Sequence, residues 1–334
     1  MASGAVRAHS GAVNPTRLEC VLDASDEGQT LAAVVRRRYD GLAWSRARAL
    51  CEQGKVTLDG EAQLDAAVRV SGGMRLEVNP TGARRRRGML DSAALVYVDA
   101  DIVVVDKPAG VLAVPYQAGD KDTLLDLTQV ALRRRRPDPQ RSPLGAVQRL
   151  DKDTTGLMVF ARHLRAKRAL AAQLAERSVT RIYRALVHGK PRSQTSDTMF
   201  VANRGDGLRG SWGVYRRPRG GPPAQARRAI THVRVLERLR DVATGDAALV
   251  ECALETGRQH QIRIHLSEAG HPLIGEHVYV RDYGGQRIDA PRIMLHAATL
   301  SFDHPRTGER VEYHSDLPAD FQRLLAELRA QPAD

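Results

Sequence analysis

The sequence has little cysteine and no long apolar run. Its three cysteines, Cys20, Cys51 and Cys252, are scattered along 334 residues. An odd, scattered set argues against a disulfide framework and a cysteine-ligated zinc, and it is typical of a reducing compartment. No apolar run approaches the roughly 18 residues of a membrane-spanning helix. Residues 1–16 lack an apolar core flanked by charge, so they do not resemble a secretory signal. We therefore expect a cytoplasmic protein without a membrane partner.

Aromatic residues make up only 4% of the chain. An RNA-recognition sheet that stacks bases on surface aromatics is therefore not expected. Positive charge is in excess instead, because 51 lysines and arginines face 39 acidic residues and give a formal net charge of +12. Such an excess favours a polyanionic partner, nucleic acid before an anionic membrane surface. Arginine clusters suit structured RNA, although a high genomic GC content would also enrich arginine.

The pattern along the chain predicts two folded units. The small unit is expected to contain a helix over 31–35, a second helix over 44–54 with Ser45 as N-cap and Gly54 as C-cap, and a hairpin at Asp59-Gly60. A run of four arginines marks the connection to the second unit. The predicted segments are a disordered terminus (1–16), the small unit (17–80), a basic linker (81–94, with Arg84 to Arg87) and the large unit (95–334).

The large unit is dominated by strand-like segments that come mostly in hairpins. This order predicts an α+β fold in which a mixed, mainly antiparallel sheet is flanked by helices. One helix is basic and amphipathic, over 163–177, with Leu164, Leu170 and Leu174 as expected core positions. The expected strands are 95–98, 102–105, 180–187, 231–239, 247–254, 292–300 and 310–314, and the other expected helices are 123–136, 259–269 and 317–330.

The most informative stretch runs from Gln148 to Phe160, where a polar loop with Asp151 leads through Gly156 into an apolar strand. Arg149 and Lys152 flank Asp151 with positive charge, a setting for an ionised carboxylate beside an anionic substrate. An aspartate that only shapes a turn is the alternative, and local sequence favours it.

Asp151, Tyr183 and Arg263 form the best catalytic hypothesis, because each lies in or beside a regular element. Arg263 would hold Asp151 through a bidentate pair, and Tyr183 offers a ring for stacking and a phenol for proton exchange. A metal site at His260 and His265 is not expected, because residues five apart lie on different sides of a helix. The Gly205–Gly210 stretch matches G-x-G-x-x-G without the strand–turn–helix context, so no nucleotide cofactor is expected.

The small unit resembles the RNA-binding domain named after a ribosomal small-subunit protein, here the S-four-type domain. Residues 45–48, 54–60 and 72–76 carry the resemblance. Asp59 replaces the usual asparagine, and Gly73 the usual aspartate. A generic helix–hairpin unit is the alternative. The resemblance implies RNA contacts by Arg46, Arg48 and Lys55.

The large unit resembles the RluA-type pseudouridine synthases between about Leu95 and Pro318. Five motifs occur in the family's order. They are Asp106 to Gly110, Arg149 to Asp151 with Thr154 to Leu157, Tyr183 to Val187, Thr256 to His265, and Leu295 to Ala297.

This resemblance implies an isomerase that breaks the N1–C1′ bond of a uridine in RNA and rejoins the base through C5, with no cofactor or metal. It implies that Asp151 is the essential group, as nucleophile or as base, that Tyr183 packs on the base, and that Arg263 pairs with Asp151. Arg149 would fill the gap left by the flipped nucleotide. The remaining expected RNA contacts are Lys107, Arg258 and His260.

Gln148 stands where the family commonly has histidine, which leaves the flipping loop open to a different conformation. We expect a monomer that acts on structured RNA, with large-subunit ribosomal RNA favoured because of the S-four-type unit. The alternatives are the same chemistry on tRNA and an inactive RNA-binding or ribosome-assembly factor. A DNA-binding protein has no helix-turn-helix or zinc pattern in its support.

Overall fold

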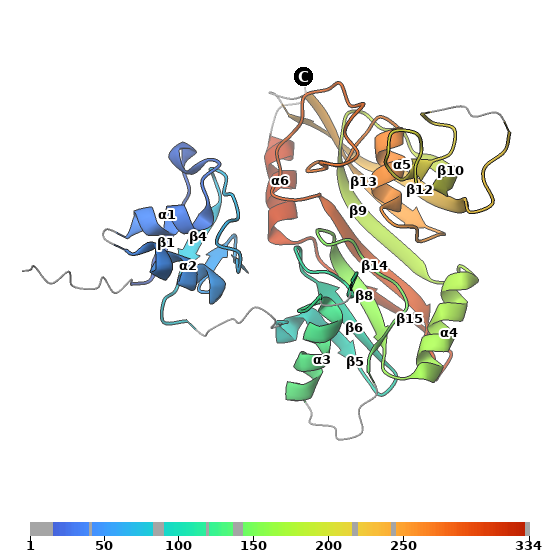
Figure 1. The fold of residues 1–334 in the computed structure, drawn as a ribbon, viewed down its shortest axis with the longest axis horizontal. Helices are drawn as coiled ribbons and strands as arrows, with labels where there is room; N and C mark the ends of the chain where they lie inside the picture. Colours follow the sequence, from blue (N-terminus) through green and yellow to red (C-terminus); the bar gives the residue numbers. More distant parts are fainter. Residues whose placement is uncertain are drawn as a thin grey trace, which may run out of the picture. The chain divides into compact units, whose positions relative to one another are not determined.

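The structure is a computed structural model that describes residues 16–39, 42–82, 90–117, 120–135, 143–215, 220–241 and 245–330. The chain divides into two compact units, Met1–Arg87 and Gly88–Asp334 (Figure 1). The division falls inside the predicted linker. The four arginines of that linker and most of the terminus predicted to be disordered lie outside the described residues.

In the first unit, two helices pack on a four-stranded sheet of order β1-β4-β2-β3. The Asp59-Gly60 turn between β2 and β3 has positive φ at both residues, +52° and +81°, as a tight hairpin requires. The prediction for Ser45 is wrong, because Ala43 is the N-cap and Ser45 lies in the first helical turn. The elements are β1 (Leu18–Val21), α1 (Leu31–Arg38), α2 (Trp44–Glu52), β2 (Val56–Leu58), β3 (Glu61–Ala62) and β4 (Arg75–Val78), with a 3₁₀ turn at Ala24–Asp26.

The second unit is built on a sheet of eleven strands in the described residues, with the order β11-β10-β12-β13-β9-β14-β8-β6-β5, β15 beside β14 and β7 beside β8. All pairings are antiparallel except that of β8 with β14, so the sheet is mixed and mainly antiparallel as predicted. The strands are β5 (Leu95–Val98), β6 (Ile102–Lys107), β7 (Gly145–Ala146), β8 (Thr155–Ala161), β9 (Thr180–His188), β10 (Gln194–Val201), β11 (Gly210–Ser211), β12 (Arg227–Asp241), β13 (Gly245–Leu254), β14 (Leu295–Asp303) and β15 (Arg310–His314).

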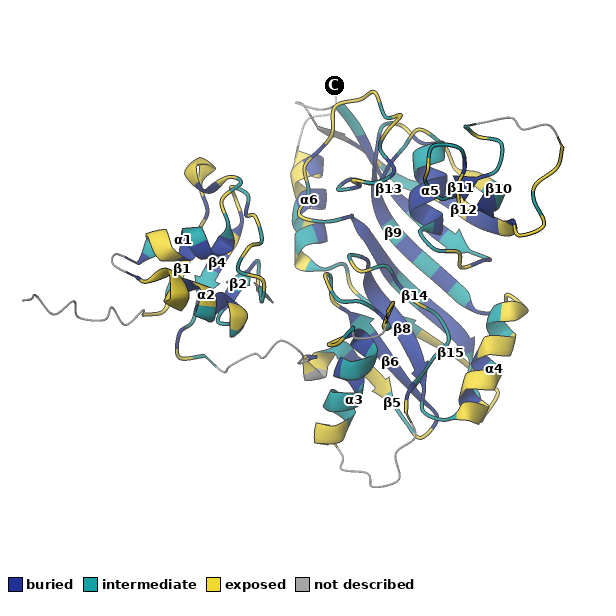
Figure 2. Cartoon of the chain, in the orientation of Figure 1, coloured by how far each residue is buried: buried dark blue, intermediate teal, exposed yellow. Residues whose placement is uncertain are grey.

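Helices cover both faces of this sheet, and its central strands are buried (Figure 2). Successive residues of β8 and β9 point to opposite faces. Met158 and Ala185 pack on the face covered by α3 and α5, whereas Leu157 and Leu186 pack on the face covered by α4 and α6. The helices are α3 (Leu124–Arg135), α4 (Leu164–Ala175), α5 (Gln261–Glu268) and α6 (Ala319–Ala330), with a 3₁₀ turn at Ser92–Ala94.

The basic helix α4 meets the sheet through fewer residues than predicted. Leu170 is buried and Leu174 is partly buried, but Leu164 is 60% exposed. Leu164 is the first residue of the helix, directly after the N-cap His163. No helix in the described residues is long and apolar enough to cross a membrane.

Gly156 allows the only parallel contact of the described sheet, at the point where the Asp151 loop enters β8. Its φ of +108° is strained for any other residue, and a Cβ atom there would collide with the backbone of Ala297. Gly156→Ala should therefore cost at least about 3 kcal/mol of the free energy of unfolding. Gly308→Ala is a matched control, since Gly308 has a φ of +73° but open space around it. It should cost about 1–2 kcal/mol. Equal losses in chemical denaturation would contradict the collision.

Candidate active site

The face covered by α3 and α5 contains a cavity of about 580 Å³. The loop before β8, strand β9 and the segment from the end of β13 into α5 line most of it, and residues at the end of α4 and the start of β14 also belong to its wall. Asp151, Tyr183 and Arg263 all lie in its wall, so the structure brings together the three residues predicted to be catalytic. The other predicted residues in the wall are Arg149, Arg258 and His260.

Two cationic side chains, Lys107 and Arg292, donate hydrogen bonds to backbone carbonyls of the Asp151 loop. The Lys107 ammonium donates to the carbonyls of Lys152 and Thr154, at 2.7 and 2.8 Å. Arg292 donates to the Asp153 carbonyl at 3.4 Å and is itself fixed by a bidentate pair with Asp320. Side-chain hydrogen bonds to three consecutive carbonyls thus restrain the backbone of the loop that carries Asp151.

Lys107 is not an RNA contact, which corrects the prediction. The side chain is completely buried, and its third donor bonds the Pro108 carbonyl at 2.9 Å. Three carbonyls use all three N–H donors of an ammonium, so none is left for a phosphate. Burial lowers the pKa of Lys107 to about 7, while Asp153 and Asp151 oppose that shift. Lys107 therefore positions the Asp151 loop.

Arg263 pairs mainly with a residue that the sequence did not single out. Its Nε and Nη2 donate to the two oxygens of Glu276 at 2.7 and 2.8 Å, whereas Nη1 lies 3.5 Å from Asp151 Oδ2. The predicted bidentate pair with Asp151 is thus wrong. Glu276 is 3% exposed. Burial opposes its ionisation, but the hydrogen bond and the charge of Arg263, together with backbone N–H groups of the same loop, outweigh burial and lower the pKa of Glu276. Because Glu276 binds Nε and Nη2, it orients the Arg263 guanidinium so that the remaining nitrogen, Nη1, faces Asp151.

His260 completes the surroundings of Asp151 in an uncommon backbone conformation. Its φ of +58° is left-handed, and it stands directly before α5. This conformation places Nε2 at 3.9 Å from Asp151 Oδ1 and Nδ1 at 2.8 Å from the Tyr279 hydroxyl. Burial lowers the pKa of His260, which Asp151 partly opposes, so the ring is neutral at neutral pH. Non-glycine residues with positive φ are concentrated at functional sites.

Tyr183 lies on β9 with its ring in the cavity wall, 8% exposed. It is paired with Cys252 on one side and Ala297 on the other, so two neighbouring strands fix its position. Burial raises the pKa of Tyr183 to about 12. The phenol is therefore protonated at neutral pH, and its ring offers an apolar surface to a flat ligand.

The rim of the cavity holds Gln148 and Arg149, the latter exposed. The Arg149 guanidinium lies 5.9 Å from the ring centroid of Tyr116, a cation–π contact. Tyr116 is 71% exposed, and Asp120 accepts hydrogen bonds from the backbone of its loop. Sequence reasoning missed Tyr116. Its exposure singles it out among the few aromatics of the chain, and only the structure shows that exposure.

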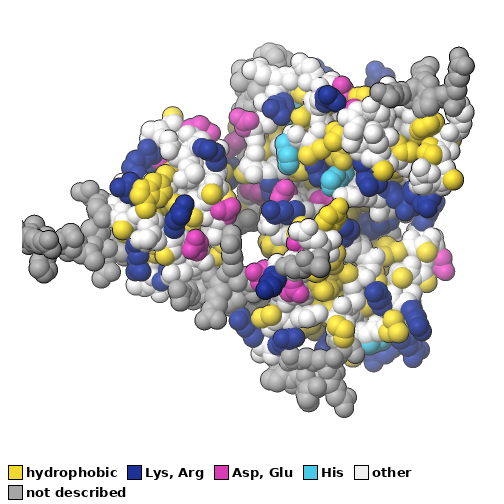
Figure 3. Space-filling model, viewed as in Figure 1, with side chains coloured by type: hydrophobic (Ala, Val, Ile, Leu, Met, Phe, Trp, Pro, Cys, Tyr) yellow, Lys and Arg dark blue, Asp and Glu magenta, His cyan; other side chains and the backbone are white. Residues whose placement is uncertain are grey.

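The remaining predicted RNA contacts lie in the first unit. Arg46 and Arg48 are exposed on α2. Lys55 is partly buried, and its ammonium donates to the Pro80 carbonyl. Figure 3 shows lysine and arginine side chains on the visible face of each unit. The charge that the composition reveals is therefore carried by both units.

Two patterns that suggested ligand sites have structural explanations. His265 is buried, and its two ring nitrogens bond the hydroxyls of Thr198 and Thr231, at 3.0 and 2.8 Å. In the Gly205–Gly210 stretch, Asp206 bonds the buried Arg204, and the stretch leads into β11 instead of a helix. Neither His265 nor the Gly205–Gly210 stretch lines the cavity.

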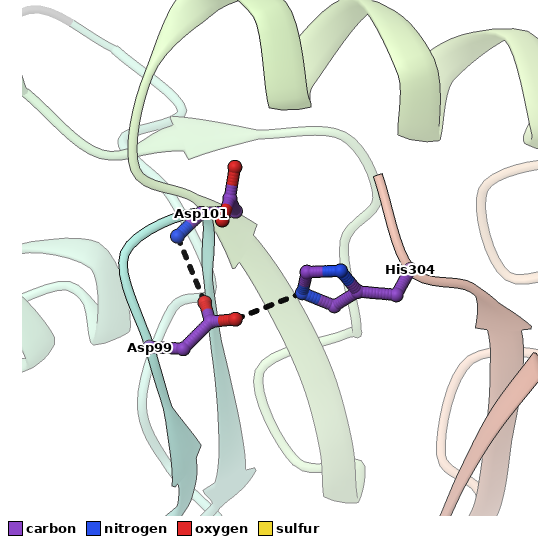
Figure 4. A group of neighbouring side chains, drawn as sticks. All are labelled: Asp99, Asp101 and His304. Carbon is purple, nitrogen blue, oxygen red and sulfur yellow. Dashed lines mark hydrogen bonds and ion pairs between the residues drawn. The ribbon is translucent and has the colours of Figure 1, made fainter. Parts of the chain in front are cut away.

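Asp99, Asp101 and His304 lie close enough to suggest a metal site (Figure 4). Their atoms already have partners. Asp99 accepts a hydrogen bond from the Asp101 backbone at 2.8 Å and lies 2.8 Å from His304 Nε2. Asp101 pairs with His163 at 3.0 Å and with Arg306 at 2.9 Å. With these partners in place, the group ties the turn after β5 to the end of β14.

Comparisons with known proteins agree with this geometry. A family described as RNA pseudouridylate synthase matches residues 101–268. The chain is 37% identical over 317 residues to the ribosomal large subunit pseudouridine synthase D of Pseudomonas aeruginosa, with 90% of this chain and 92% of that protein covered. The protein of the same name in Vibrio parahaemolyticus is 32% identical over 323 residues, which cover 91% of this chain and 92% of the relative.

Among solved structures, human RNA Pseudouridylate Synthase Domain Containing 4 superposes with a TM-score of 0.57 at 24% identity, covering 73% of this chain and 95% of that one, and shares the fold. The family match spans half of the chain, and relatives above 30% identity cover nine-tenths of it. The chain therefore belongs to the RNA pseudouridylate synthase family.

Proposed function

We propose that the chain isomerises uridine to pseudouridine in large-subunit ribosomal RNA, with Asp151 as the catalytic residue. The observation that carries this proposal is the convergence of Asp151, Tyr183 and Arg263 in one cavity. Two relatives that match nine-tenths of the chain are named for the ribosomal large subunit, which supports this substrate over tRNA.

The proposed reaction breaks the N1–C1′ bond and forms a C5–C1′ bond in the same nucleotide. N1 gains a proton and C5 loses one, so the product is an isomer and no redox partner is needed. Asp151 acts as nucleophile or as base at the sugar. Tyr183 supports the base with its ring, and Arg263 with His260 orients the carboxylate. Arg149 fills the space left in the RNA when the uridine is flipped out.

The test is a map of pseudouridines in total RNA from cells with and without the protein. We expect one or more sites of large-subunit ribosomal RNA to lose the modification. Loss in tRNA alone would favour the alternative substrate. No loss in any RNA would favour an inactive binding or assembly factor.

We propose that the first unit is an S-four-type domain that binds RNA through exposed cations such as Arg46 and Arg48. Deleting residues 1–80 should weaken binding to ribosomal RNA about tenfold or more, because several phosphate contacts are lost. Turnover of a short RNA that only enters the cavity should change much less. The two affinities can be compared by filter binding at fixed salt.

A full-length variant with Arg46→Gln and Arg48→Gln is the control for the deletion. It keeps the fold of the unit, because both side chains are exposed, and should show part of the same loss. An RNA affinity that is unchanged in both proteins would contradict the role of the first unit.

A further inference from the structure

Arg181 is a buried arginine without an acidic partner among the described residues. Its side chain is in the cavity wall and the residue is 8% exposed. Nη2 donates to the backbone carbonyls of Leu254 and Glu255, at 3.4 and 3.1 Å. Nε is buried and has no hydrogen-bond partner. Glu255 also lines the cavity, but its carboxylate bonds Arg177 and His232, both at 2.8 Å.

The other buried arginines in the described part of the second unit, Arg204 and Arg263, have carboxylate partners, and so does the half-buried Arg292. Arg204 pairs with Asp206 and Glu268, at 3.1 and 2.9 Å. Arg263 and Arg292 have bidentate pairs with Glu276 and Asp320. A buried cation without a counter-ion is costly, because desolvation is not offset. Burial accordingly lowers the pKa of Arg181, and the nearby Tyr183 opposes that shift only in part.

The surroundings of Arg181 leave room for its guanidinium and include no carboxylate that pairs with it. A Cβ atom on Gly257 would lie 2.6 Å from Arg181 Nη1, so only glycine accommodates the guanidinium at this distance. Arg177 and Arg258 line the same side of the cavity. With Glu255 as their neighbouring carboxylate, the three guanidinium groups leave a net positive charge here.

Arg181 and Tyr183 are two positions apart on β9, so their side chains lie on the same face. The separation is about 7 Å along the strand, which is within the length of one nucleotide. The phosphate of a nucleotide whose base packs on Tyr183 is therefore within reach of Arg181.

We propose that Arg181 binds the phosphate of the target nucleotide and that this phosphate is the missing counter-ion of a built anion site. The proposal rests on the proposed function, because it assigns the anion to RNA. It makes Arg181 a binding residue whose charge serves the substrate and not the fold.

The test compares Arg181→Met with Arg204→Met, since both remove a buried guanidinium. We expect Arg181→Met to keep or raise the Tm, because an unpaired buried charge is replaced by an apolar side chain. Arg204→Met should lower the Tm, because it leaves the carboxylates of Asp206 and Glu268 without their cationic partner. The affinity for a short oligouridylate should fall about tenfold or more in Arg181→Met, and the slope of log Kd against log salt should decrease by about 0.7, one phosphate contact.

Arg181→Lys should recover most of that salt slope, because it keeps the charge. The salt slopes are measured on binding, and turnover of a large-subunit ribosomal RNA transcript by the wild type is measured separately. Absence of turnover would count against the proposed function, not against the anion site. A Tm that falls in Arg181→Met as in Arg204→Met, or a salt slope equal to that of the wild type, would overturn the role of Arg181.

Discussion

Asp151→Ala is expected to abolish pseudouridine formation, with a loss of turnover of about 10⁴-fold or more, as for other essential catalytic groups. The carboxylate lies in the cavity wall beside Arg263 and His260, and no second carboxylate of the described wall is placed to replace it. Affinity for RNA should be largely retained, because binding is spread over many cationic groups. Release of tritium from C5-labelled uridine in ribosomal RNA measures the turnover, and filter binding measures the affinity.

Asp153→Asn is the matched control for Asp151→Ala. It removes a negative charge from the same loop, but Asp153 does not line the cavity, and its backbone carbonyl still bonds Arg292. We expect turnover to change by less than about tenfold, since no reacting group is lost. Turnover of Asp151→Ala within a hundredfold of the wild type would show that the catalytic assignment is wrong.

The parts of the site that follow from motifs were predictable, and their partners were not. Asp151, Tyr183 and Arg263 stand in short runs whose residue types and order identify a family. Glu276 stands in no such run, and only the folded loop after α5 brings it to Arg263. A sequence indicates which residue carries a charge, but the partner of that charge depends on tertiary contacts.

Lys107 is the opposite case, because the sequence suggested a partner for it that the structure does not provide. A lysine beside a Pro-Ala-Gly turn in a basic chain suggested a phosphate contact. The structure instead places it at the end of β6, beneath the Asp151 loop, where three carbonyls surround it. Charge predicts an anionic partner only when the side chain reaches the surface, and burial is decided by the sheet that forms around it.

The fold class was predictable because its signals are local. Apolar runs such as 102–105 and 157–161 form strands that are buried on both faces, and hairpin turns set antiparallel pairings such as β5 with β6 and β14 with β15. The parallel pairing of β8 with β14 joins segments about 140 residues apart, as the Thr155–His296 bond at 2.9 Å shows. Periodicity carries no information on such a distant pairing. Gly156 is the one residue in the local sequence that indicates this parallel pairing.

Glu276→Ala should lower both stability and turnover. The change leaves Arg263 buried without its bidentate partner, which should cost about 3–5 kcal/mol of the free energy of unfolding. Arg263 then loses its fixed orientation toward Asp151, and we expect turnover of the folded enzyme to fall about a hundredfold or more. Chemical denaturation gives the first quantity. Turnover at a temperature where the variant is fully folded, checked by circular dichroism, gives the second.

Glu268→Ala separates the two effects. Glu268 pairs with the buried Arg204 at 2.9 Å and also accepts a hydrogen bond from the Ser211 backbone, but it does not line the cavity. Its loss leaves Arg204 paired with Asp206, so it should lower stability by a smaller amount and leave the turnover of folded enzyme nearly unchanged. The double variant Glu276→Ala, Arg263→Met should regain stability, because no buried charge is left unpaired, yet remain inactive. If Glu276→Ala and Glu268→Ala lost turnover equally, Glu276 would be a stabilising residue only, and the orientation of Arg263 would not depend on it.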